Sequence, residues 1–247
     1  MKKNFKFISL LTAGLILGAS FWPKNSQALD YADSPMVVSK PQLDICNLYA
    51  WSNDEGHIVA IITFACNRQP DEGPLYDDSV LYSLHIDNTA TIAESDQVFD
   101  NNNDNESDID IHILFGQNQI GEWGVQVHHL PGLNGSILSG PVQTILEQED
   151  SDGSRVKIIA GLFDDPFFAD FEGIQNTLSN LISDTDPEDL QFTSLDVFTS
   201  LMPTGLNTDF FAGTNTMAIV MEFSAMESLA NNTESFLQIW ATTATRL

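Results

Sequence analysis

The sequence has few basic residues. Its 247 residues include 9 lysines and arginines against 35 aspartates and glutamates, which gives a formal net charge of −26. A surface of this sign repels nucleic acid and anionic lipid, so we expect no nucleic-acid partner. It would attract divalent cations, including Ca²⁺, or a basic partner. The alternative is that the acidity serves only to keep the protein soluble.

Short catalytic signatures are absent as well. The sequence contains no G-x-S-x-G, no H-E-x-x-H, no P-loop and no dinucleotide-binding fingerprint. Their absence argues against the enzyme classes that these motifs mark. It leaves open hydrolases that use carboxylates scattered along the chain.

Long apolar runs are missing beyond the N-terminus, so we expect no integral membrane segment in the mature chain. Basic residues at positions 2–6 precede an apolar stretch at 7–22 and a small-x-small sequence at 26–28. This pattern predicts a signal peptide over residues 1–28 and a single secreted or periplasmic bacterial domain over 29–247. Four of the nine basic residues lie in the leader, so the mature chain carries five against 35 acidic residues, a net charge of −30.

Cysteine is scarce, with Cys46 and Cys66 as the only two. Each lies in a predicted strand, and a short turn joins the two strands. An oxidising compartment permits a disulfide. We therefore predict that Cys46 and Cys66 form one disulfide rather than two free thiols.

Apolar and alternating runs predict a mainly β fold. Apolar and polar residues alternate over 80–87, 109–115 and 122–129, as expected for strands with one buried face. Strand-rich chains of this length usually form sandwiches or barrels, so we predict an antiparallel, sandwich-like domain. Further strands are predicted at residues 43–51, 57–66, 137–146, 155–160, 214–223 and 236–243, after an extended segment at 29–41.

Two helices are predicted to interrupt the strands. Asp165 precedes Pro166, which suits the first position of a helix, so Asp165 is expected to cap it. Apolar residues then recur at helical spacing, and a second helix is predicted to begin at Pro187. We predict a helical insertion of two helices near residues 166–202.

Several motifs, which occur in the same order as in one known family, link the chain to that family. They are Leu81-Tyr82-Ser83-Leu84-His85-Ile86-Asp87-Asn88, Asp164-Asp165-Pro166-Phe167-Phe168, Asp209-Phe210-Phe211-Ala212-Gly213 and Ile239-Trp240-Ala241-Thr242-Thr243. In these motifs the chain resembles the bacterial domain of unknown function 4331 over nearly all its mature length. The resemblance implies an exported, β-rich domain and no particular reaction. The chain departs from the family pattern at Tyr31, often a histidine there, and in the longer loop between Asp87 and Asp108.

Two groups of aspartates are candidate Ca²⁺ ligands. An asparagine-rich acidic loop carries Asp100, Asp104 and Asp108, with oxygen donors at alternate positions. It lacks the glycine and the glutamate that the EF-hand pattern requires, so a solvated loop is the alternative. Asp164 and Asp165 could bind a cation or act as an acid/base pair. The alternative for these two is capping of the predicted helix.

A third candidate is a cluster on two predicted strands. Its members are His85 and Asp87 on one strand and Asp110 and His112 on the other. If the strands pair antiparallel, the four side chains share one face and could bind a transition metal. A slip of one residue in register would separate them, so an ordinary polar face is the alternative. His128 and His129 are adjacent in a strand and are expected to point to opposite faces.

Charge, leader and candidate sites together predict an exported acidic domain that is stabilised by Ca²⁺ and acts by binding, outside the cell or at its surface. We expect it to be non-enzymatic. The alternative is a secreted hydrolase for a polysaccharide-type substrate that uses the pair Asp164 and Asp165 with a strand-face histidine.

Overall fold

The computed structural model describes residues 35–88, 91–92, 99–100, 106–133, 137–149, 155–170, 209–229 and 237–245. The chain divides into two units, residues 1–31 and 32–247, and all described residues belong to the second. The predicted signal peptide lies outside the described residues. Among the described helices, none has the length and apolar character needed to cross a membrane.

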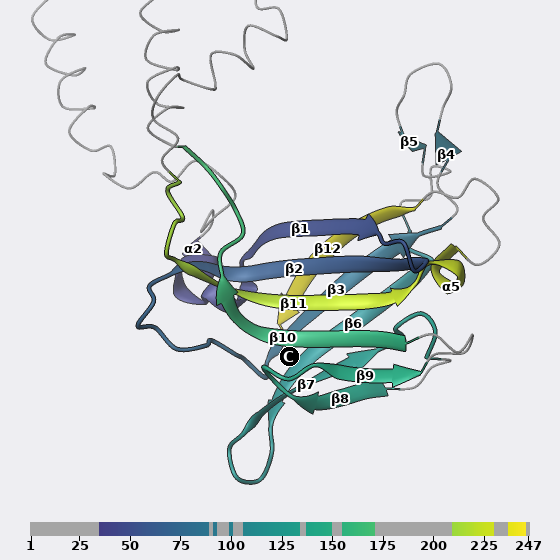
Figure 1. The fold of residues 1–247 in the computed structure, drawn as a ribbon. Helices are drawn as coiled ribbons and strands as arrows, with labels where there is room; N and C mark the ends of the chain where they lie inside the picture. Colours follow the sequence, from purple (N-terminus) through teal and green to yellow (C-terminus); the bar gives the residue numbers. More distant parts are fainter. Residues whose placement is uncertain are drawn as a thin grey trace, which may run out of the picture. The chain divides into compact units, whose positions relative to one another are not determined.

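Two antiparallel sheets of five strands each form a sandwich (Figure 1). The first sheet has the order β1-β2-β11-β10-β9 and the second the order β12-β3-β6-β7-β8. This confirms the predicted mainly β, antiparallel, sandwich-like fold. The first sheet comprises β1 (Ile45–Ser52), β2 (His57–Arg68), β11 (Asn215–Ser224), β10 (Arg155–Asp164) and β9 (Leu146–Glu149). The second comprises β12 (Gln238–Thr245), β3 (Val80–Asp87), β6 (Ile109–Gln117), β7 (Trp123–His128) and β8 (Ile137–Pro141), and β4 (Thr91–Ile92) pairs with β5 (Phe99–Asp100) separately.

The core lies between the two sheets because each long strand turns one apolar face inward. Phe64 of β2 and Tyr82 of β3 are both fully buried, and their ring centroids lie 4.5 Å apart across the sandwich. Phe115 of β6 joins them at 6.0 Å from Phe64. Tyr82 donates its hydroxyl hydrogen to the carbonyl oxygen of Gln42 at 2.6 Å. Burial of each such side chain contributes about 1.5–3 kcal/mol.

The β1–β2 hairpin confirms the predicted turn and the predicted disulfide. The turn runs through Asn53 to Gly56, whose φ of +80° is a conformation that glycine adopts without strain. Cys46 and Cys66 form a disulfide with a Cα–Cα distance of 6.4 Å. The disulfide links β1 to β2 at the end of the hairpin away from its turn.

The N-terminal part of the described chain is helical rather than extended. Residues Pro35–Ser39 form α2, and residues Pro41–Leu43 form the 3-10 helix η2. A proline begins each helix, where the missing N–H costs no hydrogen bond. The prediction of an extended segment over 29–41 was therefore wrong for residues 35–39 and for Pro41.

The strand predicted over 137–146 is broken into two. β8 ends at Pro141 in the second sheet, and β9 begins at Leu146 in the first sheet. Between them Gln143 has a φ of +58°, and its N–H donates to the carbonyl oxygen of Ala160 at 2.7 Å. The segment therefore turns a corner between the sheets, which apolar patterning alone does not reveal.

The helix predicted to begin at Pro166 does not begin there. Residues 165–170 carry no helix. The N–H of Asp165 donates to the carbonyl oxygen of Thr214 at 3.0 Å, and the N–H of Phe210 donates to that of Ala169 at 2.9 Å. These bonds keep the segment beside residues 209–214 instead of letting it coil. Residues 171–208 lie outside the described residues, so the two-helix insertion stays a prediction. A short helix, α5 (Ala225–Leu229), follows β11.

Candidate functional site

One group of side chains has the spacing of a metal site. Glu55, His57 and Glu222 each offer a ligand atom, and these atoms all lie within 4.8 Å of one another. Within the part of the chain that the structure describes, no other three His, Cys, Asp or Glu residues meet this spacing. Glu55 is exposed, Glu222 is half-buried and His57 is buried.

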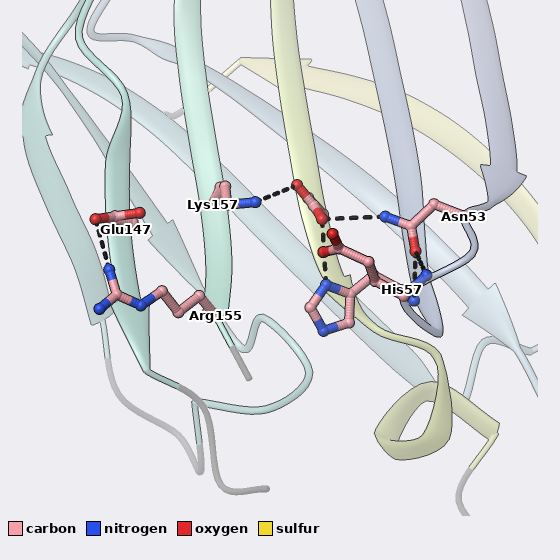
Figure 2. A network of polar contacts seen from close by, with 7 residues as sticks. Asn53, His57, Glu147, Arg155 and Lys157 are labelled. Carbon is pink, nitrogen blue, oxygen red and sulfur yellow. Dashed lines mark hydrogen bonds and ion pairs between the residues drawn. The ribbon is translucent and has the colours of Figure 1, made fainter. Parts of the chain in front are cut away.

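Asn53 holds the three residues of this group in position (Figure 2). Its Oδ1 accepts hydrogen bonds from the backbone N–H of Glu55 at 3.0 Å and of His57 at 2.9 Å. Its Nδ2 donates to Oε1 of Glu222 at 3.1 Å. Glu222 lies on β11, which pairs with β2. Ser224, two residues further along β11, lies opposite His57, so Glu222 is close to His57 on the same face of the sheet. One turn residue therefore ties the hairpin to a strand far along the chain.

Glu222 makes the main charged contacts of the group. Lys157 donates to its Oε2 at 3.0 Å, and Nδ1 of His57 lies 3.2 Å from its Oε1. Burial raises the pKa of Glu222, but the hydrogen bonds from Lys157, His57 and Asn53 outweigh burial and leave that pKa below its usual value. The carboxylate of Glu222 is therefore charged at neutral pH. Its hydrogen bond in turn raises the pKa of Lys157.

The donor atoms of the group suit a borderline transition metal. Zn²⁺ takes histidine nitrogen and carboxylate oxygen at about 2.0–2.2 Å, and two ligands of a tetrahedral zinc ion lie about 3.3 Å apart. Nδ1 of His57 donates a hydrogen bond to Oε1 of Glu222 at 3.2 Å, which is close to that separation, so Nδ1 would have to lose this hydrogen before both atoms could bind one ion. Lys157 occupies the other oxygen of Glu222, so its ammonium would stay beside the ion and weaken its binding.

The predicted aspartate sites are not assembled in this way. Asp104 lies outside the described residues, and the side chain of Asp100 is not described. Asp108 accepts a hydrogen bond from the N–H of Asn88 at 2.9 Å, at the base of the loop. Asp164 is exposed at the end of β10, whereas Asp165 is buried.

Asp165 forms a hydrogen bond within the segment after β10 and is not part of an open site. Its Oδ1 accepts a hydrogen bond from the N–H of Phe167 at 3.0 Å. Burial raises its pKa, and the charges of Asp209 and Asp164 act in the same direction. Its Oδ2 is buried and makes no hydrogen bond within the described part of the chain.

Three residues of the predicted strand-face cluster do share one surface. Strands β3 and β6 pair antiparallel, with His85 opposite Asp110 and Ser83 opposite His112. Nδ1 of His85 lies 2.6 Å from Oδ1 of Asp110. The hydrogen bonds from Ser107 and from His85 lower the pKa of Asp110 against the opposing effect of burial. Asp87, further along β3, is 1% exposed and so lies outside the open surface.

Two more histidines join this surface, contrary to the sequence prediction. His128 of β7 lies directly opposite His112 of β6. His129 has a φ of +60°, and this left-handed conformation breaks the alternation of the strand. Its ring centroid lies 6.2 Å from that of His128 and 5.8 Å from that of His112. The prediction that His128 and His129 point to opposite faces was therefore wrong.

A groove of about 660 Å³ lies over β6, β7 and β8, next to this surface. Gly116 of β6 lies directly opposite Gly124 of β7, and Gly124 lies opposite Pro141 of β8. The two glycines have no side chain to fill the groove. Amide and hydroxyl groups, which can bind a polar ligand, stand around it on Gln117, Asn118, Gln126 and Ser139.

Comparisons of this chain with family models, with curated proteins and with solved structures find no match. The resemblance to the domain of unknown function 4331 therefore stays a prediction.

Proposed function

We propose that this chain is an exported, non-enzymatic β-sandwich domain that binds a divalent cation, which stabilises its fold. The group Glu55, His57 and Glu222 carries the proposal, because its donor atoms lie within 4.8 Å of one another. A net charge of −26 supports cation binding in general, since bound cations relieve the repulsion between carboxylates.

The imidazole in this group favours Zn²⁺ over Ca²⁺. Ca²⁺ takes oxygen ligands, six to eight of them, whereas Zn²⁺ accepts three protein ligands of mixed nitrogen and oxygen type plus water. We therefore assign Zn²⁺ or a similar metal to Glu55, His57 and Glu222. The proposal of Ca²⁺ binding applies to the acidic loop with Asp100, Asp104 and Asp108.

The hydrolase alternative has less support. It needs Asp164 and Asp165 close to a strand-face histidine, His85 or His112. Asp164 belongs to β10 of the first sheet, whereas the two histidines lie on the outward surface of the second sheet. Asp165 already accepts a backbone hydrogen bond and has a raised pKa through burial.

Thermal unfolding tests the proposal directly. A ligand that binds the native state raises the free energy of unfolding by about 2.7 kcal/mol at one hundred times its Kd. For a domain of this size we expect Zn²⁺ to raise the Tm by about 5–10 °C relative to EDTA. The variant Glu55→Gln should lose most of that rise, because it removes an exposed ligand without disturbing the buried contacts of His57 and Glu222.

The variant Glu147→Gln is the matched control. Glu147 is an acidic residue on β9, at the edge of the same sheet, where it pairs with Arg155 of β10 at 2.8 Å (Figure 2). Its loss should leave the zinc-dependent rise unchanged. An equal rise in Glu55→Gln and in the wild type would contradict the assignment of the site. Absence of any rise with Zn²⁺ or Ca²⁺ would contradict the proposed function itself.

A further inference from the structure

The groove over β6, β7 and β8 is nearly uncharged, although the protein is strongly acidic. Among the described residues that line it, Glu122 is the only charged one, and its Oε2 accepts a hydrogen bond from Nδ2 of Asn118 at 2.9 Å. The chain as a whole carries a formal net charge of −26. The protein therefore repels an anionic ligand, and a cationic ligand finds a single carboxylate in the groove. This distribution of charge favours a neutral ligand.

Glycine keeps the groove open. Phe115 of β6 is buried in the core, so the residues on either side of it, Leu114 and Gly116, face outward. Gly116 lies directly opposite Gly124 of β7. A Cβ atom added at Gly116 would meet no heavy atom within 4 Å, apart from those of its two neighbours in the chain. The space beside Gly116 is therefore empty and can hold part of a ligand.

Hydrogen-bonding groups around the groove are not used within the protein. Gln117 and Ser139 are exposed, and their side chains make no hydrogen bond within the described part of the chain. Oε1 of Gln126 lies 3.0 Å from Nε2 of His128, which leaves the two N–H groups of the Gln126 amide for a ligand. Amides and hydroxyls together donate and accept hydrogen bonds, as the hydroxyl groups of a sugar require.

Apolar surface completes the lining. It comes from Leu114 of β6, Trp123 of β7 and Pro141 of β8. Trp123 is half-buried, and its ring centroid lies 5.5 Å from that of Tyr76. A sugar ring presents C–H groups as well as hydroxyls, so it matches a lining that mixes amides with apolar side chains. The volume of about 660 Å³ lies within the range of about 300–1,000 Å³ that is typical of small-molecule sites.

We propose that the groove over β6, β7 and β8 binds a neutral oligosaccharide. Its hydroxyl groups would bond to Gln117, Gln126 and Ser139, and one face of a sugar ring would lie over Gly116. This binding goes beyond the proposed cation site and does not depend on it, because Glu55, His57 and Glu222 belong to the β1–β2 turn and the first sheet.

An extended peptide is a less suitable occupant of this groove. Peptides commonly bind a sheet by adding a strand to an open edge. Strands β6 and β7 each have a paired strand on both sides, so their backbone groups are already used within the sheet. A peptide would therefore have to bind through side chains alone, and a basic one would find only Glu122.

Isothermal titration calorimetry in EDTA tests the proposal without any bound cation. The probes are cellohexaose, maltohexaose and N-acetylchitohexaose. We expect at least one of them to bind with a Kd below about 1 mM. Its affinity should change less than about twofold between 50 mM and 500 mM NaCl, because an uncharged ligand is not affected by screening. The anionic hexagalacturonic acid should not bind.

The variant Gly116→Val tests the location of the site. Valine suits a strand, and its Cβ meets open space, so the variant should fold while its side chain fills the groove and weakens binding at least tenfold. The matched control is Gly73→Val. Gly73 lies in the loop between β2 and β3, outside the groove, and a Cβ added there also meets no atom within 4 Å. This control should bind the sugar as the wild type does.

The variant Gln126→Ala provides a second test should Gly116→Val fail to fold, which circular dichroism would show. Loss of the Gln126 amide should weaken binding about fivefold. Absence of binding by all three neutral hexasaccharides would overturn the proposal. Wild-type affinity in a folded Gly116→Val protein, or in Gln126→Ala, would overturn it as well, since the sugar would then bind elsewhere. Binding of hexalysine but of no hexasaccharide, abolished by Gly116→Val, would assign the groove to a basic peptide instead.

Discussion

At the residue scale, Glu222 connects three parts of the first sheet. Its carboxylate contacts Lys157 of β10 at 3.0 Å, His57 of β2 at 3.2 Å and Asn53 of the turn at 3.1 Å. All three contacts depend on the charge or on the acceptor capacity of the carboxylate. Protonation of Glu222 would weaken them together, so the stability of this end of the sheet should depend on pH.

The sign of that dependence follows from the lowered pKa of Glu222. The pKa of an unfolded glutamate is about 4.3. Because the folded pKa lies below it, the stabilisation is fully present above the unfolded pKa and is lost as the pH falls through the folded pKa. At pH 7 we expect Glu222→Gln to lower the free energy of unfolding in urea by about 1 kcal/mol. At pH 3 the difference from the wild type should be much smaller.

Glu147→Gln again serves as the control. The pair between Glu147 and Arg155 is exposed, and exposed pairs contribute about 0–1 kcal/mol. The variant Glu147→Gln should therefore change the midpoint of urea unfolding little at pH 7 or at pH 3. A difference between wild type and Glu222→Gln that stays constant from pH 7 to pH 3 would contradict the role given to the charge.

At the element scale, alternation in the sequence predicts strands well where one face is buried. The prediction of a strand over 80–87 coincides with β3, and the predictions over 109–115 and 122–129 differ from β6 and β7 by a residue or two at the ends. In those strands, apolar and polar side chains alternate with a period of two residues, and the sequence shows this alternation directly. The break between β8 and β9 depends instead on a bond from Gln143 to Ala160, a contact between distant residues that a local pattern does not contain.

The same distinction explains what could be predicted of the candidate sites. His85, Asp110 and His112 lie on two successive strands of the second sheet, so antiparallel pairing alone brings them together. His57 and Glu222 are 165 residues apart in sequence, and only the β11–β2 pairing joins them. The position of His129 depends on its left-handed backbone conformation. Residues other than glycine adopt this conformation only rarely, so a histidine in the sequence does not predict it.

The disulfide gives a prediction for the β1–β2 hairpin. Cys46 and Cys66 are 20 residues apart, and a crosslink that closes a loop of this length stabilises a domain by about 3 kcal/mol, mainly by restricting the unfolded chain. We expect the double variant Cys46→Ser, Cys66→Ser to lose about that much free energy of unfolding in urea. The wild type in the presence of a reductant should behave like the variant.

A reductant should have no effect on the double variant, which controls for other effects of the reagent. A loss well below 1 kcal/mol in both the variant and the reduced wild type would contradict the role of the crosslink. The zinc-dependent rise in Tm should persist in the variant, because the group of Glu55, His57 and Glu222 lies at the turn end of the hairpin and the disulfide at the other.

At the scale of the whole molecule, the excess of acidic residues acts on stability in two separable ways. Repulsion among carboxylates destabilises the compact state, and any added salt screens it. A cation bound at one site acts through its affinity for the native state alone and saturates. With a formal net charge of −26, both effects should be large enough to measure.

Separate titrations with NaCl and with Zn²⁺ distinguish these two effects. We expect NaCl between 10 mM and 500 mM to raise the Tm gradually, because the Debye length falls from about 30 Å to less than 10 Å over that range. Micromolar Zn²⁺ changes the ionic strength negligibly, so a rise in Tm at that concentration comes from a site. The variant Glu55→Gln should keep the gradual rise with NaCl and lose the saturable rise with Zn²⁺. Loss of both would mean that Glu55 contributes through general repulsion rather than as a metal ligand.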